Sequence, residues 1–317
     1  MAGKILLGDL SGSLCVKLAL ADPGGRPDHV ERYGCTNFED FAEALRYFVA
    51  DNGNPNIVGA AFSTSGWEVD GQIDLVHYGF KLDRREVGAL LGVRGLAVVN
   101  NFVAKALAVP VLERHERVKV CGEDMAPEHV VAVIGPTQGL GGAFLSPNGR
   151  GGWVATHCEG GHGDFAPTNA LEIEILKLLM ARYGHVSRER AVSEPGICEL
   201  WRCMGLIEGT DDADSAPEVE EILAMAYVGD GRALRVIEVQ TELFAGAASD
   251  FALTTGARGG VYLSGSFLDT LGDLFKPDVF ARRFHDKGRV SSYVRDIPVY
   301  QILPGETEIL GISTLFD

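Results

Sequence analysis

The chain has 317 residues, of which 46% are hydrophobic and 23% charged, a composition typical of a soluble globular protein with two domains. Its 44 acidic and 28 basic residues give a net charge of −16, which disfavours nucleic acid as a partner because phosphate neutralisation needs clustered lysine and arginine. No segment is apolar enough to span a bilayer, and residues 1–9 lack a signal peptide's hydrophobic segment, so we expect no membrane contact and a cytoplasmic location.

The first third of the chain alternates apolar strands with helical patterns. Strands are predicted at 4–7, 14–20, 29–34, 57–62 and 96–99, and helices at 38–48, 84–91 and 102–109. Thr36 or Asn37 is expected to cap the first helix, and Asp70-Gly71 predicts a hairpin turn. The last strand of this part ends at two amides, Asn100 and Asn101, just where the next helix begins.

A polar linker at 113–128 is expected before the pattern starts again. Strands are predicted at 130–134, 141–145, 153–156, 260–263 and 297–302, and helices at 170–183, 195–204, 217–227, 232–251 and 306–314. Both halves therefore open with two strands joined by a glycine-containing turn. This repeat predicts a duplicated α/β fold with a cleft between the copies, a small domain at 1–110 plus 304–317 and a large domain at 111–303.

Asn100 and Asn101 lie where a strand's carboxyl end meets a helix start, the position at which open α/β sheets bind ligands. Their side chains either cap the helix or point together at a polar ligand. Glycine-bearing turns at 8–13, 135–141 and 259–266 can each present backbone N–H groups to phosphate. Any one alone predicts only a tight turn, whereas three at comparable places favour a nucleotide site. Asp9 either holds Mg²⁺ through water or forms an Asx turn.

The segment from His157 to Asp164 is dense in histidine, cysteine and acids. It invites a zinc interpretation, but no second cysteine pair lies nearby to complete a tetrahedral site. A carboxylate and an imidazole flanking two glycines fit hydrogen bonding to a polyhydroxy ligand, and the alternative is a surface loop. Glu189, two residues after Ser187, is typical of the first turn of a helix that Ser187 caps.

Four segments, VVNNFVAKALAVP, CEGGHGDFAP, GHVSRERAVSEPG and DKGRVSSYVRDIPVYQI, resemble the bacterial-type glucokinases of the hexokinase/actin-like ATPase superfamily. The resemblance covers nearly the whole chain. It implies two ribonuclease-H-like α/β domains with an interdomain cleft, and phosphorylation of glucose on its 6-hydroxyl with ATP and Mg²⁺. It also implies a homodimer.

The resemblance assigns roles to named positions. The hexose contacts would be Asn100, Glu159, His162 and Glu189, which replaces the structural interpretation of Glu189. The phosphate contacts would be Gly8, Asp9, Ser11, Gly12 and Ser13 in the first turn and Gly135, Thr137, Gln138 and Gly139 in the second. Gly265 would lie near adenosine, and Asp9 would hold Mg²⁺ through water.

The departures from the family pattern lie mostly on the side of the base and the nucleotide. Where the family has an aspartate as general base, this chain has Asn101; its phosphate turns read GDLSGSL and GPTQGLG, and LVHYGF stands at 75–80 near the sugar. An amide accepts no proton, and losing a positioned base costs about 10²–10⁴-fold in rate. We therefore expect kinase activity that is weak or lost; the alternative is a non-catalytic sugar-binding sensor or regulatory protein.

Overall fold

The computed structural model describes residues 3–12, 15–34, 37–66, 68–75, 79–123, 128–210 and 216–316. The chain forms two compact units. The first is Met1–Leu112 together with Pro304–Asp317, and the second is Glu113–Leu303. The first unit is therefore assembled from both ends of the sequence.

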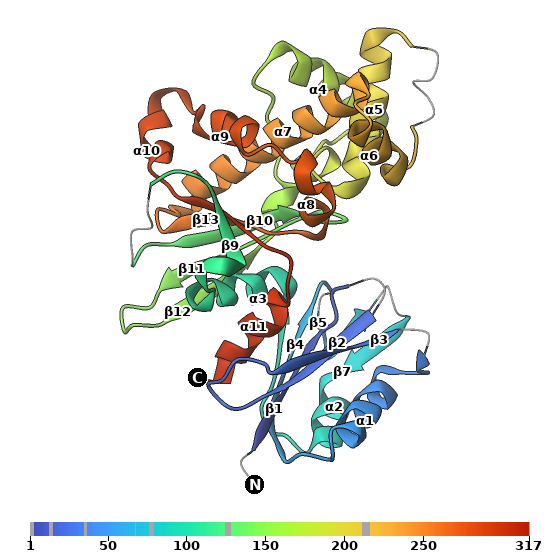
Figure 1. Ribbon diagram of the computed structural model, residues 1–317, viewed down its shortest axis with the longest axis vertical. Helices are drawn as coiled ribbons and strands as arrows, with labels where there is room; N and C mark the ends of the chain where they lie inside the picture. Colours follow the sequence, from blue (N-terminus) through green and yellow to red (C-terminus); the bar gives the residue numbers. More distant parts are fainter. Residues whose placement is uncertain are drawn as a thin grey trace. The chain divides into compact units, whose positions relative to one another are not determined.

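A five-stranded mixed sheet forms the centre of the first unit, in the order β3-β2-β1-β4-β8 (Figure 1). Its strands are β1 (Lys4–Asp9), β2 (Cys15–Ala21), β3 (His29–Gly34), β4 (Ile57–Thr64) and β8 (Leu96–Asn100). β2 is antiparallel to its two neighbours, whereas β1, β4 and β8 are parallel. The carboxyl ends of β1, β4 and β8 therefore lie along one edge, where Asp9 pairs in register with Ser63, and Thr64 with Asn100.

A small three-stranded sheet contains β5 (Glu68–Val69), β6 (Gln72–Leu75) and β7 (Phe80–Asp83). Asp70 and Gly71 join its first two strands with φ angles of 52° and 85°. Both angles lie in the left-handed region that a tight hairpin turn requires. The predicted hairpin turn is confirmed.

Helices cover both faces of the five-stranded sheet. α1 (Phe41–Asp51) and α2 (Arg84–Leu91) pack on the face that carries Leu6 and Leu18. α3 (Asn101–Ala108) and α11 (Thr307–Ser313) pack on the opposite face, which carries Ile5 and Leu7. Short 3₁₀ turns η2 (Val109–Val111) and η8 (Thr314–Phe316) follow α3 and α11. The alternation of side chains along β1 thus supplies two separate cores.

The start of α1 differs from the prediction. Its N-cap is Asp40, whose side chain accepts a hydrogen bond of 2.6 Å from the N–H of Glu43. Asn37 precedes the helix, and Thr36 lies outside the described residues. Thr36, Asn37 and Asp40 are all residue types that cap helices. Asp40 is the one that caps α1, and the buried Phe41 follows it directly.

The second unit is built on a six-stranded sheet in the order β12-β11-β10-β13-β14-β9 (Figure 1). Its strands are β9 (Arg117–Cys121), β10 (Val131–Pro136), β11 (Leu140–Pro147), β12 (Trp153–Cys158), β13 (Gly260–Leu263) and β14 (Val299–Ile302). β10, β13 and β14 are parallel, and β11 is antiparallel to β10 and β12. The first five strands of this order repeat the pattern of the first unit, which confirms the predicted duplicated α/β fold.

β9 corrects the predicted linker at 113–128. Its five residues pair antiparallel with β14 at the sheet edge, after the 3₁₀ turn η3 (Arg114–Glu116). Charged Arg117 and Lys119 alternate with Val118 and Val120, so the segment is polar on average although it has the two-residue period of an edge strand.

The other helical elements described in the second unit are η4 (Gly160–His162), α4 (Ala170–Tyr183), η5 (Arg188–Arg190), α5 (Glu194–Glu208), α6 (Val219–Tyr227), α7 (Gly231–Thr255), α8 (Ser266–Leu271), η6 (Gly272–Leu274), α9 (Pro277–His285), η7 (Gly288–Val290) and α10 (Ser291–Arg295). The long helix α7 runs through the core and packs against α5, α6 and α9. α8, α9 and α10 were not predicted, because short helices separated by turns carry too little periodicity.

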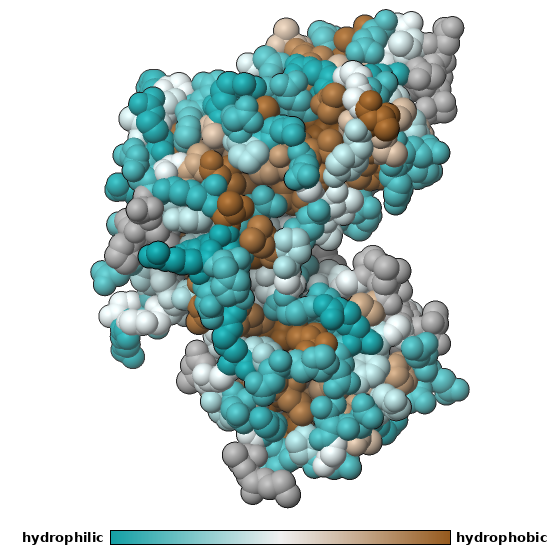
Figure 2. Space-filling view, viewed as in Figure 1, coloured by the Kyte–Doolittle hydropathy of each residue, from teal (hydrophilic) through white to brown (hydrophobic). Residues whose placement is uncertain are grey.

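Within the described parts of the chain, no helix has the length and apolar character needed to cross a bilayer. In the view of Figure 2, hydrophilic residues cover most of the visible surface of each unit, and apolar residues form small groups between them.

Candidate active site

Asp9 ends β1 and is buried, with 2% of its surface exposed. Its Oδ1 accepts hydrogen bonds from the backbone N–H of Ser11 at 3.1 Å, from the Ser11 hydroxyl at 2.7 Å and from the Ser63 hydroxyl at 2.9 Å. This is the Asx turn that the sequence allowed. A role for Asp9 toward Mg²⁺ stays a prediction.

Lys17 faces the other oxygen of Asp9. Its Nζ lies 3.5 Å from Asp9 Oδ2 and 3.1 Å from Glu306 Oε2. Burial alone would lower the pKa of Lys17, yet the carboxylates around it, with Asp9 the strongest, raise it. The buried Asp9 carboxylate is thereby compensated by a cation of the chain itself.

The two amides at the start of α3 converge on one donor. The backbone N–H of Phe102 donates to Asn100 Oδ1 at 2.8 Å and to Asn101 Oδ1 at 3.0 Å. Asn100 is the N-cap residue of the helix. Of the two alternatives that the sequence left open, the structure shows capping; a further role of these side chains in binding a ligand stays a prediction.

In the second unit, two histidines and two glutamates form a chain of close contacts. His157 on β12 lies 3.1 Å from Glu159 through Nε2, and His162 on η4 lies 3.7 Å from the other oxygen of Glu159. His162 Nδ1 is 4.0 Å from Glu189 Oε1 on η5. All four side chains are 30–57% exposed, so a ligand from solvent can reach them. We call this set the His-Glu cluster.

Backbone contacts bring η4 and η5 together. The N–H of Arg188 donates to the carbonyl of Gly163 at 2.9 Å, and Asp164 forms an isolated bridge with Ser187. A Cβ at Gly161 would collide with the carbonyl oxygen of Leu140, so only glycine lets η4 lie this close to β11. Gly161 therefore serves close backbone packing.

Glu189 also reaches the glycine-rich turn at 135–141. Its Oε2 accepts a hydrogen bond of 2.8 Å from the N–H of Leu140, and a Cβ at Gly139 would lie 2.5 Å from the same oxygen. Glu189 lies in a 3₁₀ turn rather than at the start of a long helix. The Glu189 carboxylate thus contacts both His162 of the His-Glu cluster and the predicted phosphate turn.

The turn itself uses most of its donors internally. The N–H of Thr137 donates to the carbonyl of Gly139 at 2.7 Å, the N–H of Gly139 donates to the Thr137 hydroxyl at 3.2 Å, and Pro136 has no N–H. The Gln138 side chain is hydrogen-bonded to Glu194. The N–H groups of Thr137 and Gly139 therefore already have acceptors within the chain, and a role for residues 135–141 toward phosphate stays a prediction.

The other two glycine turns also pack tightly. A Cβ at Gly265 would collide with the carbonyl of Pro136, and one at Gly135 with that of Ser264, so these turns touch directly. A Cβ at Gly8 would lie 2.5 Å from the Phe62 ring. Close backbone approach accounts for Gly135 and Gly265, and the Phe62 ring for Gly8, while a role of these turns toward a nucleotide stays a prediction. In the described stretches of the chain, no group of three or more histidine, cysteine or acidic residues is placed to hold a metal ion.

The glucokinase family model matches residues 6–317. The chain belongs to the glucokinase family. A glucokinase from Chromobacterium violaceum is 37% identical over 314 residues, which cover 97% of this chain and 88% of that protein. The match over nearly the whole chain confirms the resemblance stated from the sequence.

Solved structures give the same fold. A glucokinase from an Antarctic psychrotroph has a TM-score of 0.90 at 24% identity, and covers 100% of this chain and 99% of its own. A ROK family glucokinase from Streptomyces griseus, solved in complex with glucose and AMPPNP, has a TM-score of 0.62 at 17% identity and 99% coverage of both chains.

For this glucokinase-family chain, the structure brings Glu159, His162 and Glu189 together, and groups Asp9 and Asn100 along one sheet edge. Gly12 is described, while Ser13 and residues 76–78 of the LVHYGF segment lie outside the described residues. The sequence alone assigned no role to His157, which contacts Glu159 in the structure. His157 lies on β12, whereas Glu159 follows the end of that strand, so no strand periodicity linked the two side chains.

Proposed function

We propose that this chain binds a hexose and phosphorylates its 6-hydroxyl slowly with ATP. Membership of the glucokinase family supports the reaction class, because glucokinases use ATP. The observation that supports hexose binding is the exposed His-Glu cluster, in which neighbouring carboxylate and imidazole groups lie within 4.0 Å of each other and face solvent.

The proposed roles follow from hydrogen-bonding capacity. The carboxylates of Glu159 and Glu189 accept hydrogen bonds from sugar hydroxyls, and His162 either donates or accepts. Asn100 offers its amide N–H groups, since its oxygen is already used on Phe102. Several such bonds orient a hydroxyl-rich ring without any covalent chemistry from the protein.

Two features lower the expected rate. Asn101 stands where the family resemblance places the general base, and an amide takes no proton from the 6-hydroxyl. The N–H groups of Thr137, Gly139 and Leu140 are used within the chain, so nucleotide phosphates would have to compete for them. When bound, MgATP supplies the phosphoryl group; the residues named here only position the acceptor.

The test is Asn101→Asp, with glucose 6-phosphate formation measured in a coupled assay. We expect this change to raise kcat by about 10²–10⁴-fold, the usual contribution of a positioned base, with little change in KM for glucose. Asn56→Asp, at an exposed position before β4, is the matched control and should leave kcat unchanged. An Asn101→Asp variant as slow as the wild type would place the defect in nucleotide binding instead.

Asn101 also favours a second candidate, a non-catalytic hexose sensor. Calorimetry with glucose and with MgATP separately shows which half of the site binds, and a turnover assay distinguishes the two candidates. A sensor binds glucose but shows no phosphoryl transfer even with saturating MgATP. Turnover at ordinary glucokinase rates would exclude the sensor, and failure to bind any hexose would exclude both candidates.

A further inference from the structure

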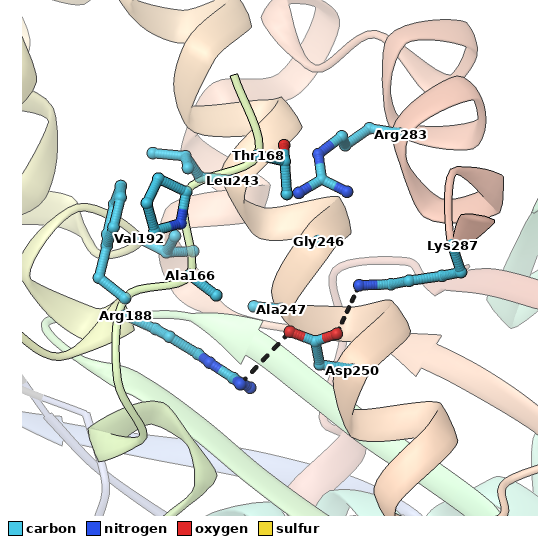
Figure 3. A pocket seen from close by; sticks show the side chains of 12 residues that line it. Ala166, Thr168, Arg188, Val192, Leu243, Gly246, Ala247, Asp250, Arg283 and Lys287 are labelled. Carbon is cyan, nitrogen blue, oxygen red and sulfur yellow. Dashed lines mark hydrogen bonds and ion pairs between the residues drawn. The ribbon is translucent and has the colours of Figure 1, made fainter. Parts of the chain in front are cut away.

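A pocket lies in the second unit, on the side of η5 that carries Arg188 (Figure 3). It has a volume of about 230 Å³ and is bounded by α7, the end of α9, η5 and the segment at 165–168. Its polar lining is dominated by three cations, Arg188, Arg283 and Lys287, with Asp250 as the acid among them. We call it the cationic pocket.

Asp250 neutralises only part of this charge. Its Oδ2 lies 3.3 Å from Arg188 Nη2, and its Oδ1 is paired with Lys287 Nζ. Figure 3 shows these two contacts as dashed lines and none at Arg283. Three cationic side chains and one carboxylate leave the pocket with an excess of about two positive charges, in a chain whose net charge is −16.

Arg283 is the unusual group. It is buried, with 9% of its surface exposed, yet its Nε and Nη1 have no hydrogen-bond partner among the described residues. A Cβ at Gly246 on α7 would lie 2.9 Å from Arg283 Nη2, so the glycine leaves room for the guanidinium. A buried guanidinium without partners is costly, because its donors lose water and gain nothing in exchange.

The helix dipole does not explain this burial. Arg283 is in the last turn of α9, where a cation interacts favourably with the free carbonyls. However, Arg282 and His285 occupy the same turn, and the Arg282 side chain is 63% exposed. An exposed cation obtains that stabilisation without desolvation, so the inward direction of Arg283 requires another reason.

We propose that the cationic pocket binds the phosphoryl group of a small molecule, either inorganic phosphate or a phosphate monoester. The excess of about two charges matches a phosphate dianion, and the planar guanidinium of Arg283 suits paired hydrogen bonds to its oxygens. The volume is below the roughly 300–1,000 Å³ of pockets for drug-sized ligands, which favours a small anion. This site is separate from the His-Glu cluster and does not depend on kinase activity.

The experiment is calorimetric titration of the full chain with sodium phosphate and with glycerol 3-phosphate, at constant ionic strength set by chloride. Wild type should bind, and Arg283→Met should bind about 10–100-fold more weakly through loss of charge-assisted hydrogen bonds. Arg282→Met, on the exposed side of the same turn, is the matched control and should bind as wild type does. Tighter binding of the monoester would identify a metabolite as the ligand, and equal binding would identify phosphate itself.

Thermal unfolding gives an independent readout. Without phosphate, Arg283→Met should unfold at a higher temperature than wild type, because it removes a desolvated cation. Phosphate should raise the Tm of wild type and of Arg282→Met, and raise that of Arg283→Met much less. If Arg283→Met does not fold, Arg283→Lys keeps the charge but loses the planar fork, and should bind phosphate more weakly. No binding by wild type, or equal binding by wild type and the folded Arg283 variant, would overturn the proposal.

Discussion

Lys105 is a buried cation one helical turn after Asn101 on α3. It is 6% exposed, and its Nζ lies 3.3 Å from Glu308 Oε1 on α11 and 5.0 Å from the centre of the Phe102 ring. Burial raises the pKa of Glu308, while Lys105 opposes that shift. The pair therefore links the helix that carries the candidate base position to the C-terminal helix.

The Lys105–Glu308 pair gives a prediction at the scale of single residues. Lys105→Met leaves a buried carboxylate unpaired and should lower the free energy of unfolding by about 3–5 kcal/mol. Lys105→Met with Glu308→Leu removes both charges and should recover most of that loss. Urea denaturation of the wild type, both single variants and the double variant measures the effect. A double variant no more stable than Lys105→Met would contradict this account.

At the scale of elements, the sequence predicted the helices that have a clear N-cap residue and a glycine after their last residue. α2 and α4 begin and end where expected, because Asp83 and Asn169 cap them and Gly92 and Gly184 follow them. The predicted cap of α1 was wrong because several adjacent residues were able to cap it. β9 was missed because an edge strand with one polar face resembles a loop in composition.

The contact between α3 and α11 depends on one glycine. A Cβ at Gly311 would collide with the carbonyl oxygen of Ala104, so Gly311→Ala forces the two helices apart. We expect a loss of about 1–3 kcal/mol in the free energy of unfolding, despite the better helix propensity of alanine. Gly88→Ala in α2 is the matched control; its Cβ would lie 3.5 Å from Val93 O, so it should be neutral or stabilising by up to about 1 kcal/mol. Equal effects of the two changes in urea denaturation would contradict the close contact.

At the scale of the whole molecule, the duplication of the α/β fold was predictable from the sequence, because each copy opens with the same strand–turn–strand pattern; the order of the strands in each sheet was not. The contact between Glu189 and Leu140 was not, because it joins segments far apart in the chain through one side chain. The burial of Arg283 was also not predictable from the sequence, since an arginine in a helix is exposed far more often than buried. The local sequence pattern specifies where helices and strands form, whereas tertiary contacts decide which buried polar groups, such as Arg283, lack hydrogen-bond partners.

The bond from Leu140 N–H to Glu189 implies thermodynamic linkage between two ligands. On the proposed function, a hexose that binds Glu189 changes the position of the carboxylate that accepts the hydrogen bond from the Leu140 N–H. A nucleotide bound at the turn competes for the same N–H and so changes the position of the carboxylate that binds the hexose. The glucose Kd should therefore change when a non-hydrolysable ATP analogue is present, by about 5–150-fold, and the Kd of the analogue should change by the same factor with glucose. Calorimetry in both orders of addition measures both factors, and a glucose Kd unaffected by the analogue would show independent sites. On the proposed function, a single carboxylate that both ligands influence makes the coupling between their affinities a property of the fold.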